Sequence, residues 1–124
     1  MLVVDKFSRV PIYEQIISGI ERMILSGELK EKDALPSVRQ LSLELSVNPN
    51  TLQKAYAELE QRGICFSVPG SGRYVSDNAL DIIKKERRAA LSEIERITRE
   101  LIQCGVGIDE ITAAVNNAFK GELS

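Results

Sequence analysis

The sequence contains no histidine and no tryptophan, and only two of its 124 residues are cysteine. Without histidine it lacks the most common general base, and no nucleophile motif or phosphate-binding loop replaces it, so an enzyme is not expected. Cys65 and Cys104 lie far apart without the Cys-x-x-Cys spacing of zinc sites, so neither a metal nor another cofactor is expected. We expect both to be small buried side chains, with a disulfide or a thiol sensor as the alternatives.

Long apolar runs are absent as well. No stretch approaches the roughly 20 apolar residues of a membrane span. Asp5 and Lys6 interrupt the short apolar start of the chain, where a signal peptide would continue. A cytoplasmic protein without membrane contact is therefore expected. With 44% hydrophobic residues, the chain can build one small packed domain and an extension.

An excess of positive charge, which is usual in nucleic-acid-binding domains, is also missing. The formal net charge is −2, with 16 Lys and Arg against 18 Asp and Glu. The deficit of basic residues is shared evenly between residues 1–78 and residues 79–124. Any binding to DNA must therefore come from local patches instead of a field from the whole protein.

The most informative stretch is residues 35–56, which predicts two short amphipathic helices with a very short connection. Ser37 is a natural N-cap for the first helix, and Gln40 is placed to complete a capping box. Asn48 is a natural N-cap for the second helix, and Pro49 fits its first position. The apolar residues on one face of each helix are Val38, Leu41 and Leu45, and Leu52, Ala55, Tyr56 and Leu59. Two such helices must cross steeply, as in a helix-turn-helix.

The outward face of the second helix has a composition that suits DNA. It carries Asn50, Gln53, Lys54 and Ala57, and no acidic residue occurs in this helix before Glu58. Amides and a cation can contact base edges and phosphates. An ordinary solvated helix face has a similar composition, so this pattern alone leaves both interpretations open.

Further elements on either side complete a winged domain. An amphipathic helix is predicted over residues 11–27, ahead of the motif. After the motif, residues 64–68 and 73–75 predict a strand pair around a Pro-Gly-Ser-Gly turn. A hairpin in this position is a wing, and its tip carries Gly72 and Arg73 but no acidic residue. Glycine there lets the backbone approach a phosphate or a groove wall closely.

The last third of the chain follows a different pattern. Residues 80–104 place apolar side chains at the first and fourth positions of a heptad, which predicts one long helix. A last helix is predicted to begin at Asp109. Neither helix can bury its apolar stripe alone, so the two helices must fold back on the winged domain or pair with a second chain. We expect the second outcome, a homodimer with its interface here. The expected interface residues are Ile83, Ile94, Ile97, Leu101, Val115 and Phe119.

The middle of the chain resembles the winged helix-turn-helix of the GntR superfamily of bacterial transcription regulators, in particular its short YtrA-like branch. The resemblance rests on the PIYEQI start, the LPS-x-R sequence, the NPNT and KAY segments and the Gly-x-Gly of the wing. It covers residues 8–76, and the short helical tail also fits this branch. The resemblance implies a repressor, often of a transporter operon that includes its own gene.

The resemblance also implies which residues contact DNA. In the family these contacts come from the arginine of the LPS-x-R sequence, the start of the recognition helix and the wing glycine. The expected contact residues in this chain are Ser37, Arg39, Asn48, Asn50, Thr51, Gln53, Lys54, Gly72 and Arg73. Many members carry arginine where this chain has Pro49 and Gln53, so no operator sequence can be carried over.

We therefore predict a mainly α-helical chain with a small β-hairpin. Residues 1–77 are expected to form a winged helix-turn-helix domain, and residues 78–124 a two-helix dimerisation segment. The predicted function is sequence-specific regulation of transcription by a homodimer on palindromic, double-stranded operator DNA. The alternative is a protein-interaction module on a winged-helix scaffold, which the net negative charge favours. The sequence names no operator, target gene or small-molecule effector.

Overall fold

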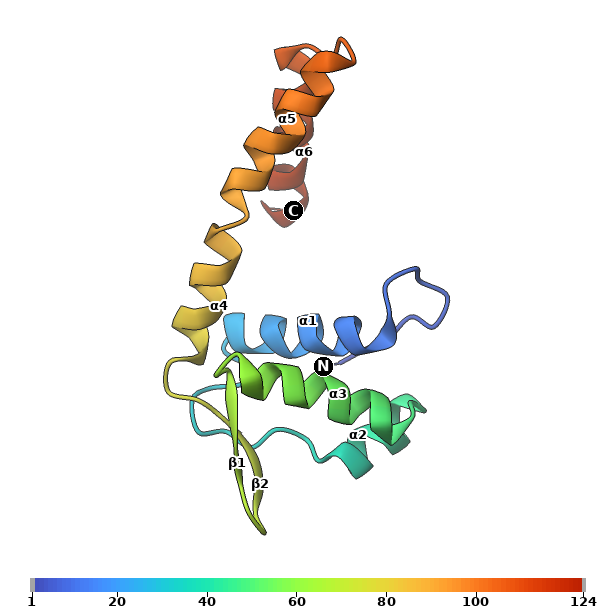
Figure 1. Ribbon diagram of the computed structural model, residues 1–124, viewed down its shortest axis with the longest axis vertical. Helices are drawn as coiled ribbons and strands as arrows, with labels where there is room; N and C mark the ends of the chain where they lie inside the picture. Colours follow the sequence, from blue (N-terminus) through green and yellow to red (C-terminus); the bar gives the residue numbers. More distant parts are fainter. Residues whose placement is uncertain (1, 124) are drawn as a thin grey trace. The chain divides into compact units, whose positions relative to one another are not determined.

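The structure, a computed structural model, describes residues 2–123, with the side chains of residues 2–121. The elements are α1 (Ile12–Leu25), α2 (Val38–Leu45), α3 (Pro49–Gln61), β1 (Cys65–Val68), β2 (Gly72–Val75), α4 (Ala79–Arg88), α5 (Leu91–Gln103) and α6 (Ile108–Leu123) (Figure 1). The described chain is thus mainly α-helical with one hairpin, as predicted. It divides into two compact units, a first unit up to Lys85 and a second unit from Glu86 onward.

The first unit is built around α3, against which α1, α2 and β1 all pack (Figure 1). The apolar face predicted for α3 is fully buried, with Leu52, Tyr56 and Leu59 each at most 1% exposed. Ile16 and Ile20 of α1 are 0% exposed in the same cluster. Each such aliphatic side chain contributes about 2 kcal/mol when it is removed from water, so this cluster is the main source of the unit's stability.

The predicted caps fix where α2 and α3 begin. Ser37 Oγ accepts a hydrogen bond from the backbone N–H of Gln40 at 3.0 Å. The Gln40 side chain donates to Glu44 instead of returning to the cap, so only half of the capping box forms. Asn48 Oδ1 accepts from the backbone N–H of Asn50 at 2.8 Å, at the start of α3. The two helices therefore begin where their capping residues predict.

The hairpin forms a two-stranded antiparallel sheet in which Cys65 pairs with Val75 and Val68 with Gly72. Cys65 and Val75 point into the core of the first unit and are 3% and 1% exposed. Phe66 and Val68 are exposed on the strand. The alternation of residues 64–68 thus predicted the strand correctly, and the side that faces the core is the one with Cys65.

The core of the first unit continues beyond residue 77, where the sequence predicted a domain boundary. Ala79 and Ile83 of α4 belong to the core cluster and are 1% and 0% exposed. The prediction that Ile83 lies in a dimer interface is therefore wrong, because the unit's own core already covers its side chain. α4 is anchored in the first unit by these two residues.

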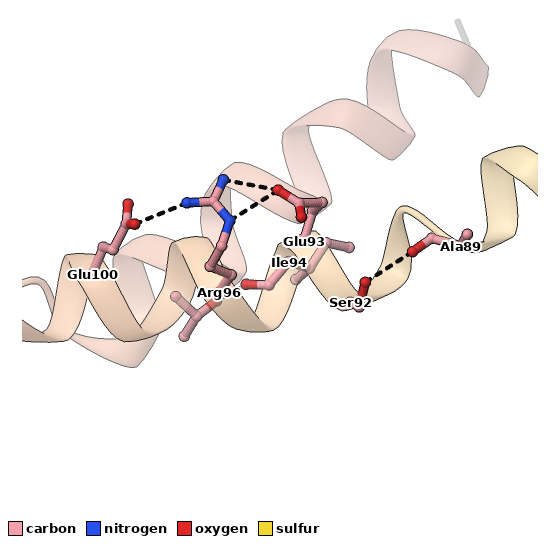
Figure 2. A network of polar contacts seen from close by, with 7 residues as sticks. Ala89, Ser92, Glu93, Ile94, Arg96 and Glu100 are labelled. Carbon is pink, nitrogen blue, oxygen red and sulfur yellow. Dashed lines mark hydrogen bonds and ion pairs between the residues drawn. The ribbon is translucent and has the colours of Figure 1, made fainter.

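Within residues 86–121, the second unit has no core of its own. The predicted long helix is interrupted at Ala89 and Ala90, which separate α4 from α5, and α6 then runs back in the opposite direction to α5 (Figure 1). At the interruption, Ser92 Oγ donates to the carbonyl oxygen of Ala89 at 2.9 Å (Figure 2). No side chain of residues 86–121 is buried. Cys104 is exposed, so the expectation of a buried thiol is wrong for Cys104 and confirmed for Cys65.

One face of α5 is covered by ion pairs. Arg96 lies between Glu93 and Glu100 and is 2.8 Å from a carboxylate oxygen of each (Figure 2). Arg99 and Glu95 form a further pair one helical turn apart. Exposed pairs of this kind contribute only about 0.3–0.5 kcal/mol each, so they support the helix without replacing a core.

The helices of the described residues are all too short or too polar to span a membrane.

Candidate nucleic-acid interface

The outward face of α3 carries the side chains that the sequence singled out. Asn50, Gln53 and Lys54 are exposed, while Thr51 is half-buried. The helical repeat turns these residues away from Leu52 and the core. The first turn of α3 contains no acidic residue, and the helix N-terminus adds partial positive charge there. This end of α3 is therefore suited to an anionic partner.

The start of α2 and the wing lie beside this face. A groove of about 230 Å³ is lined by residues from three segments: Ala34, Leu35, Pro36, Ser37 and Val38, then Gln53 and Tyr56, then Ser71, Gly72 and Arg73. The structure thus brings Ser37, Gln53, Gly72 and Arg73 together around one groove. The side chain of Arg39 is exposed near the start of α2, and it forms no hydrogen bond or ion pair within residues 2–121.

The wing tip depends on glycine. Gly70 has φ 77° and Gly72 has φ 135°, both in the region that side-chain-bearing residues rarely adopt. A Cβ at Gly72 would meet open space, so the constraint comes from the backbone angle and not from crowding. Any other residue at Gly72 therefore strains the turn that places the wing.

The sequence placed Arg73 at the wing tip as a predicted DNA contact, but its side chain does not project from the tip. Its side chain is directed to α3, where Nη2 donates to Gln53 Oε1 at 3.2 Å. The guanidinium carbon lies 5.4 Å from the centre of the Tyr56 ring, and Nε lies 4.0 Å from Glu60 Oε1. These contacts connect the wing to the recognition helix.

Tyr56, on the buried face of α3, also supports the connection between the wing and the recognition helix. Its hydroxyl donates to the carbonyl oxygen of Pro36 at 2.7 Å, which ties α3 to the segment before α2. Burial raises the pKa of Tyr56 well above its usual range, while the charge of Arg73 acts in the opposite direction. The phenol is therefore neutral at neutral pH, as a donor to the Pro36 carbonyl oxygen must be.

Lys54 occupies the other edge of the exposed face. Its Nζ lies 3.8 Å from the centre of the Tyr13 ring on α1, a cation–π contact. Tyr13 Oη donates to Glu14 at 3.2 Å, and this carboxylate raises the pKa of Tyr13. Lys54 and Gln53 thus lie toward different neighbours, α1 and the wing.

Sequence reasoning missed two residues of this region, Lys6 and Tyr13. Lys6 Nζ donates to the carbonyl oxygen of Ser46, just before the recognition helix, at 2.8 Å. Lys6 lies outside every motif of the sequence and is 40 positions from Ser46, which lies in the short connection of the helix-turn-helix. No periodic pattern could have paired them, and the same holds for Tyr13 and Lys54.

Within the described residues, no group of His, Cys, Asp and Glu could hold a metal ion.

Comparison with known proteins identifies the family of this fold. The model for bacterial regulatory proteins of the gntR family matches residues 12–75, which is more than half of the chain and includes α1, α2, α3 and the wing. The chain belongs to the GntR family. The HTH-type transcriptional repressor YtrA of Bacillus subtilis is 37% identical to it over 130 residues, covering 98% of this chain and all of YtrA.

Solved GntR-type structures agree with this assignment. A GntR family transcriptional regulator from Listeria monocytogenes superimposes with a TM-score of 0.72 at 34% identity, covering 92% of this chain and 98% of its own. AraR(DBD) in complex with operator ORX1 superimposes with a TM-score of 0.53 at 27% identity, covering 59% of this chain and 87% of its own. This GntR-family chain is therefore a transcription regulator with a winged helix-turn-helix, and not an enzyme.

Proposed function

We propose that this GntR-family regulator is a cytoplasmic homodimeric repressor that binds a palindromic operator upstream of its own operon. The observation that carries the proposal is the single exposed surface formed by the start of α2, the outward face of α3 and the wing, joined by the Arg73–Gln53 hydrogen bond of 3.2 Å. Its exposed groups are amides, hydroxyls and cations, the groups that contact bases and phosphates.

The contacts to DNA are divided among three segments. Arg39 suits a guanine, because its planar fork can donate to O6 and N7 together. Lys54 suits a phosphate as a point charge. The remaining proposed contacts are Ser37, Asn48, Asn50, Thr51, Gln53 and the backbone at Gly72. AraR(DBD), which superimposes on 59% of this chain, is itself in complex with an operator.

The homodimer rests on the second unit. Ile94, Ile97, Val115 and Phe119 are all more than 40% exposed, and Leu101 is half-buried. α5 and α6 bury none of these side chains completely, so a large apolar surface faces solvent in the single chain. Monomeric proteins rarely expose a patch of this kind, and a second copy of the same two helices provides a matching one.

The repressor role and the type of target gene come from relatives. YtrA of Bacillus subtilis is named a transcriptional repressor, and it matches the chain over nearly its whole length. MngR of Escherichia coli, 38% identical over 71 residues, is named a repressor of a mannosyl-D-glycerate transport and metabolism system. We accordingly propose a transporter-type operon as the target.

A footprint on the DNA upstream of the chain's own gene tests this function. A protected site with two inverted half-sites, bound by a species that sediments as a dimer, is expected. Protection that is absent across the whole region would contradict control of its own operon. Failure to select any sequence from random DNA would favour the protein-interaction alternative.

A further inference from the structure

The Arg73 side chain is held against α3 on three sides. Nη2 donates to Gln53 Oε1 at 3.2 Å, and the guanidinium lies over the Tyr56 ring. Its Nε is buried and has no hydrogen-bond partner in the described chain, while Glu60 Oε1 lies 4.0 Å away. Glu60 also accepts a hydrogen bond from Ser67 of the wing. The arginine side chain is only 25% exposed, so it is placed as a support and not as a free cation.

This arrangement determines which end of the Gln53 amide faces Arg73. A guanidinium carries only donors, so it can bind the amide through oxygen and never through the NH₂ group. Gln53 lies on the exposed face of α3, and this hydrogen bond connects it to the wing. With Oε1 directed to Arg73, the NH₂ group is the end left for a partner outside the protein.

We propose that Arg73 is a positioning residue that makes Gln53 a hydrogen-bond donor toward DNA, so that Gln53 selects guanine over adenine. This inference rests on the proposed function, since it requires Gln53 to face the major groove. Guanine presents two acceptors there, N7 and O6, whereas adenine presents the N7 acceptor beside an N6 donor. A free glutamine reads adenine with its oxygen and its NH₂ together. An amide whose oxygen is held by Arg73 keeps one free lone pair but cannot turn that oxygen freely toward adenine N6, so its pairing with adenine is weakened while its NH₂ group keeps its match to guanine.

The test is a selection of full-length protein on randomised operators. Gln53→Ala first identifies the base pair that Gln53 reads, as the position whose preference disappears. The unchanged protein should prefer G·C at that pair by about fivefold or more. Arg73→Met removes the donors but keeps an apolar stem over Tyr56, and it should move the preference at that pair alone toward A·T. Arg22→Met, which removes an exposed arginine of α1, should leave the preference unchanged.

The salt dependence of binding separates positioning from phosphate contact. The slope should be the same for Arg73→Met and the unchanged protein, because Arg73 contacts no phosphate in this scheme. Even weakening of all operators by Arg73→Met, with guanine still preferred at the Gln53 pair, would overturn the inference. If Arg73→Met does not fold, Gln53→Glu serves instead, since a carboxylate only accepts and should prefer the cytosine N4 donor. Retained guanine preference in Gln53→Glu would also overturn it.

The inference and the proposed function fail in different ways. Sequence selection by the unchanged protein, combined with no change at any position in Gln53→Ala, overturns the role of Gln53 and leaves the repressor intact. Absence of any selected sequence in the unchanged protein overturns both.

Discussion

The two units of this chain have similar proportions of apolar residues but use them for opposite purposes. Up to Lys85, aliphatic residues of several elements converge on α3 and are buried within a single chain. From Glu86 to residue 121, helices with equally clear apolar stripes bury no side chain. The difference lies in geometry, since a core needs at least two layers that face each other. A stripe without a facing layer in its own chain indicates an interface.

The largest effect is expected from a substitution that disrupts the proposed dimer interface of the second unit. Ile97→Glu places a charge in the apolar stripe of α5, and desolvating it in a dimer is costly. We expect a monomer in sedimentation and a loss of operator affinity of about 100-fold or more, since two linked half-site contacts become one. Gln103→Glu adds the same charge to an exposed polar position of the same helix and is the control. A dimeric Ile97→Glu protein would remove α5 from the interface.

The next largest effect concerns the first unit's core. Leu52→Ala removes a side chain that is 0% exposed in α3, and it should lower the free energy of unfolding by about 2–5 kcal/mol. Leu43→Ala, at a position 73% exposed, should change it by less than about 0.5 kcal/mol. Urea unfolding of both variants measures this. Equal losses would mean that exposure in the single chain does not describe the folded state.

DNA reading should be confined to the first unit. Arg39→Ala should cost about 1–3 kcal/mol per half-site and relax the preference at one base pair, because it removes a bidentate base contact. Lys54→Ala should weaken all sequences alike and lower the salt slope by about one per subunit. Binding to operator variants over a salt series distinguishes the two. Neither variant should change the sedimentation coefficient, and exchanged behaviour would reverse the assigned roles.

The smallest effect compares the two cysteines. Burial raises the pKa of Cys65 from the ordinary value of 9.0 to about 11, with the charge of Glu60 as a lesser cause. Between these values the unfolded chain has lost the proton that the folded chain retains, so stability falls as pH rises. The loss is about 2 kcal/mol or less. Urea unfolding at about pH 8 and about pH 10 measures this loss of stability. Compared with the unchanged protein, the loss should be smaller in Cys65→Ala and the same in Cys104→Ala, which changes an exposed residue. If Cys65→Ala loses as much stability between these pH values as the unchanged protein, the Cys65 thiol is not a source of the pH dependence.

The sequence predicted the first unit better than the second because its signals are local. Caps at Ser37 and Asn48, helical spacing and a glycine turn each act within a few residues, and each is confirmed. The heptad pattern continued through Ala89 and Ala90, so it concealed the helix interruption and assigned Ile83 to the wrong surface. The spacing of apolar residues along a helix reveals an apolar stripe, but it does not show whether the same chain or a second chain covers that stripe.

For the site, the sequence identified the exposed residues of α3 but not their partners. Spacing placed Gln53 outward, whereas its bond to Arg73 links positions 20 residues apart through the strand register. The contact of Lys54 with Tyr13 likewise depends on how α1 lies on α3. Such contacts arise from packing between elements, and one-dimensional periodicity carries no information about them.

Amide hydrogen exchange at two protein concentrations tests most directly whether the second unit needs a second copy. At a concentration that gives a dimer, α1, α3, α5 and α6 should all be protected. On dilution to the monomer, protection of α5 and α6 should fall while that of α1 and α3 stays constant, because the first unit has a core within one chain and residues 86–121 bury no side chain. Unchanged protection of α5 and α6 in the monomer would contradict the account.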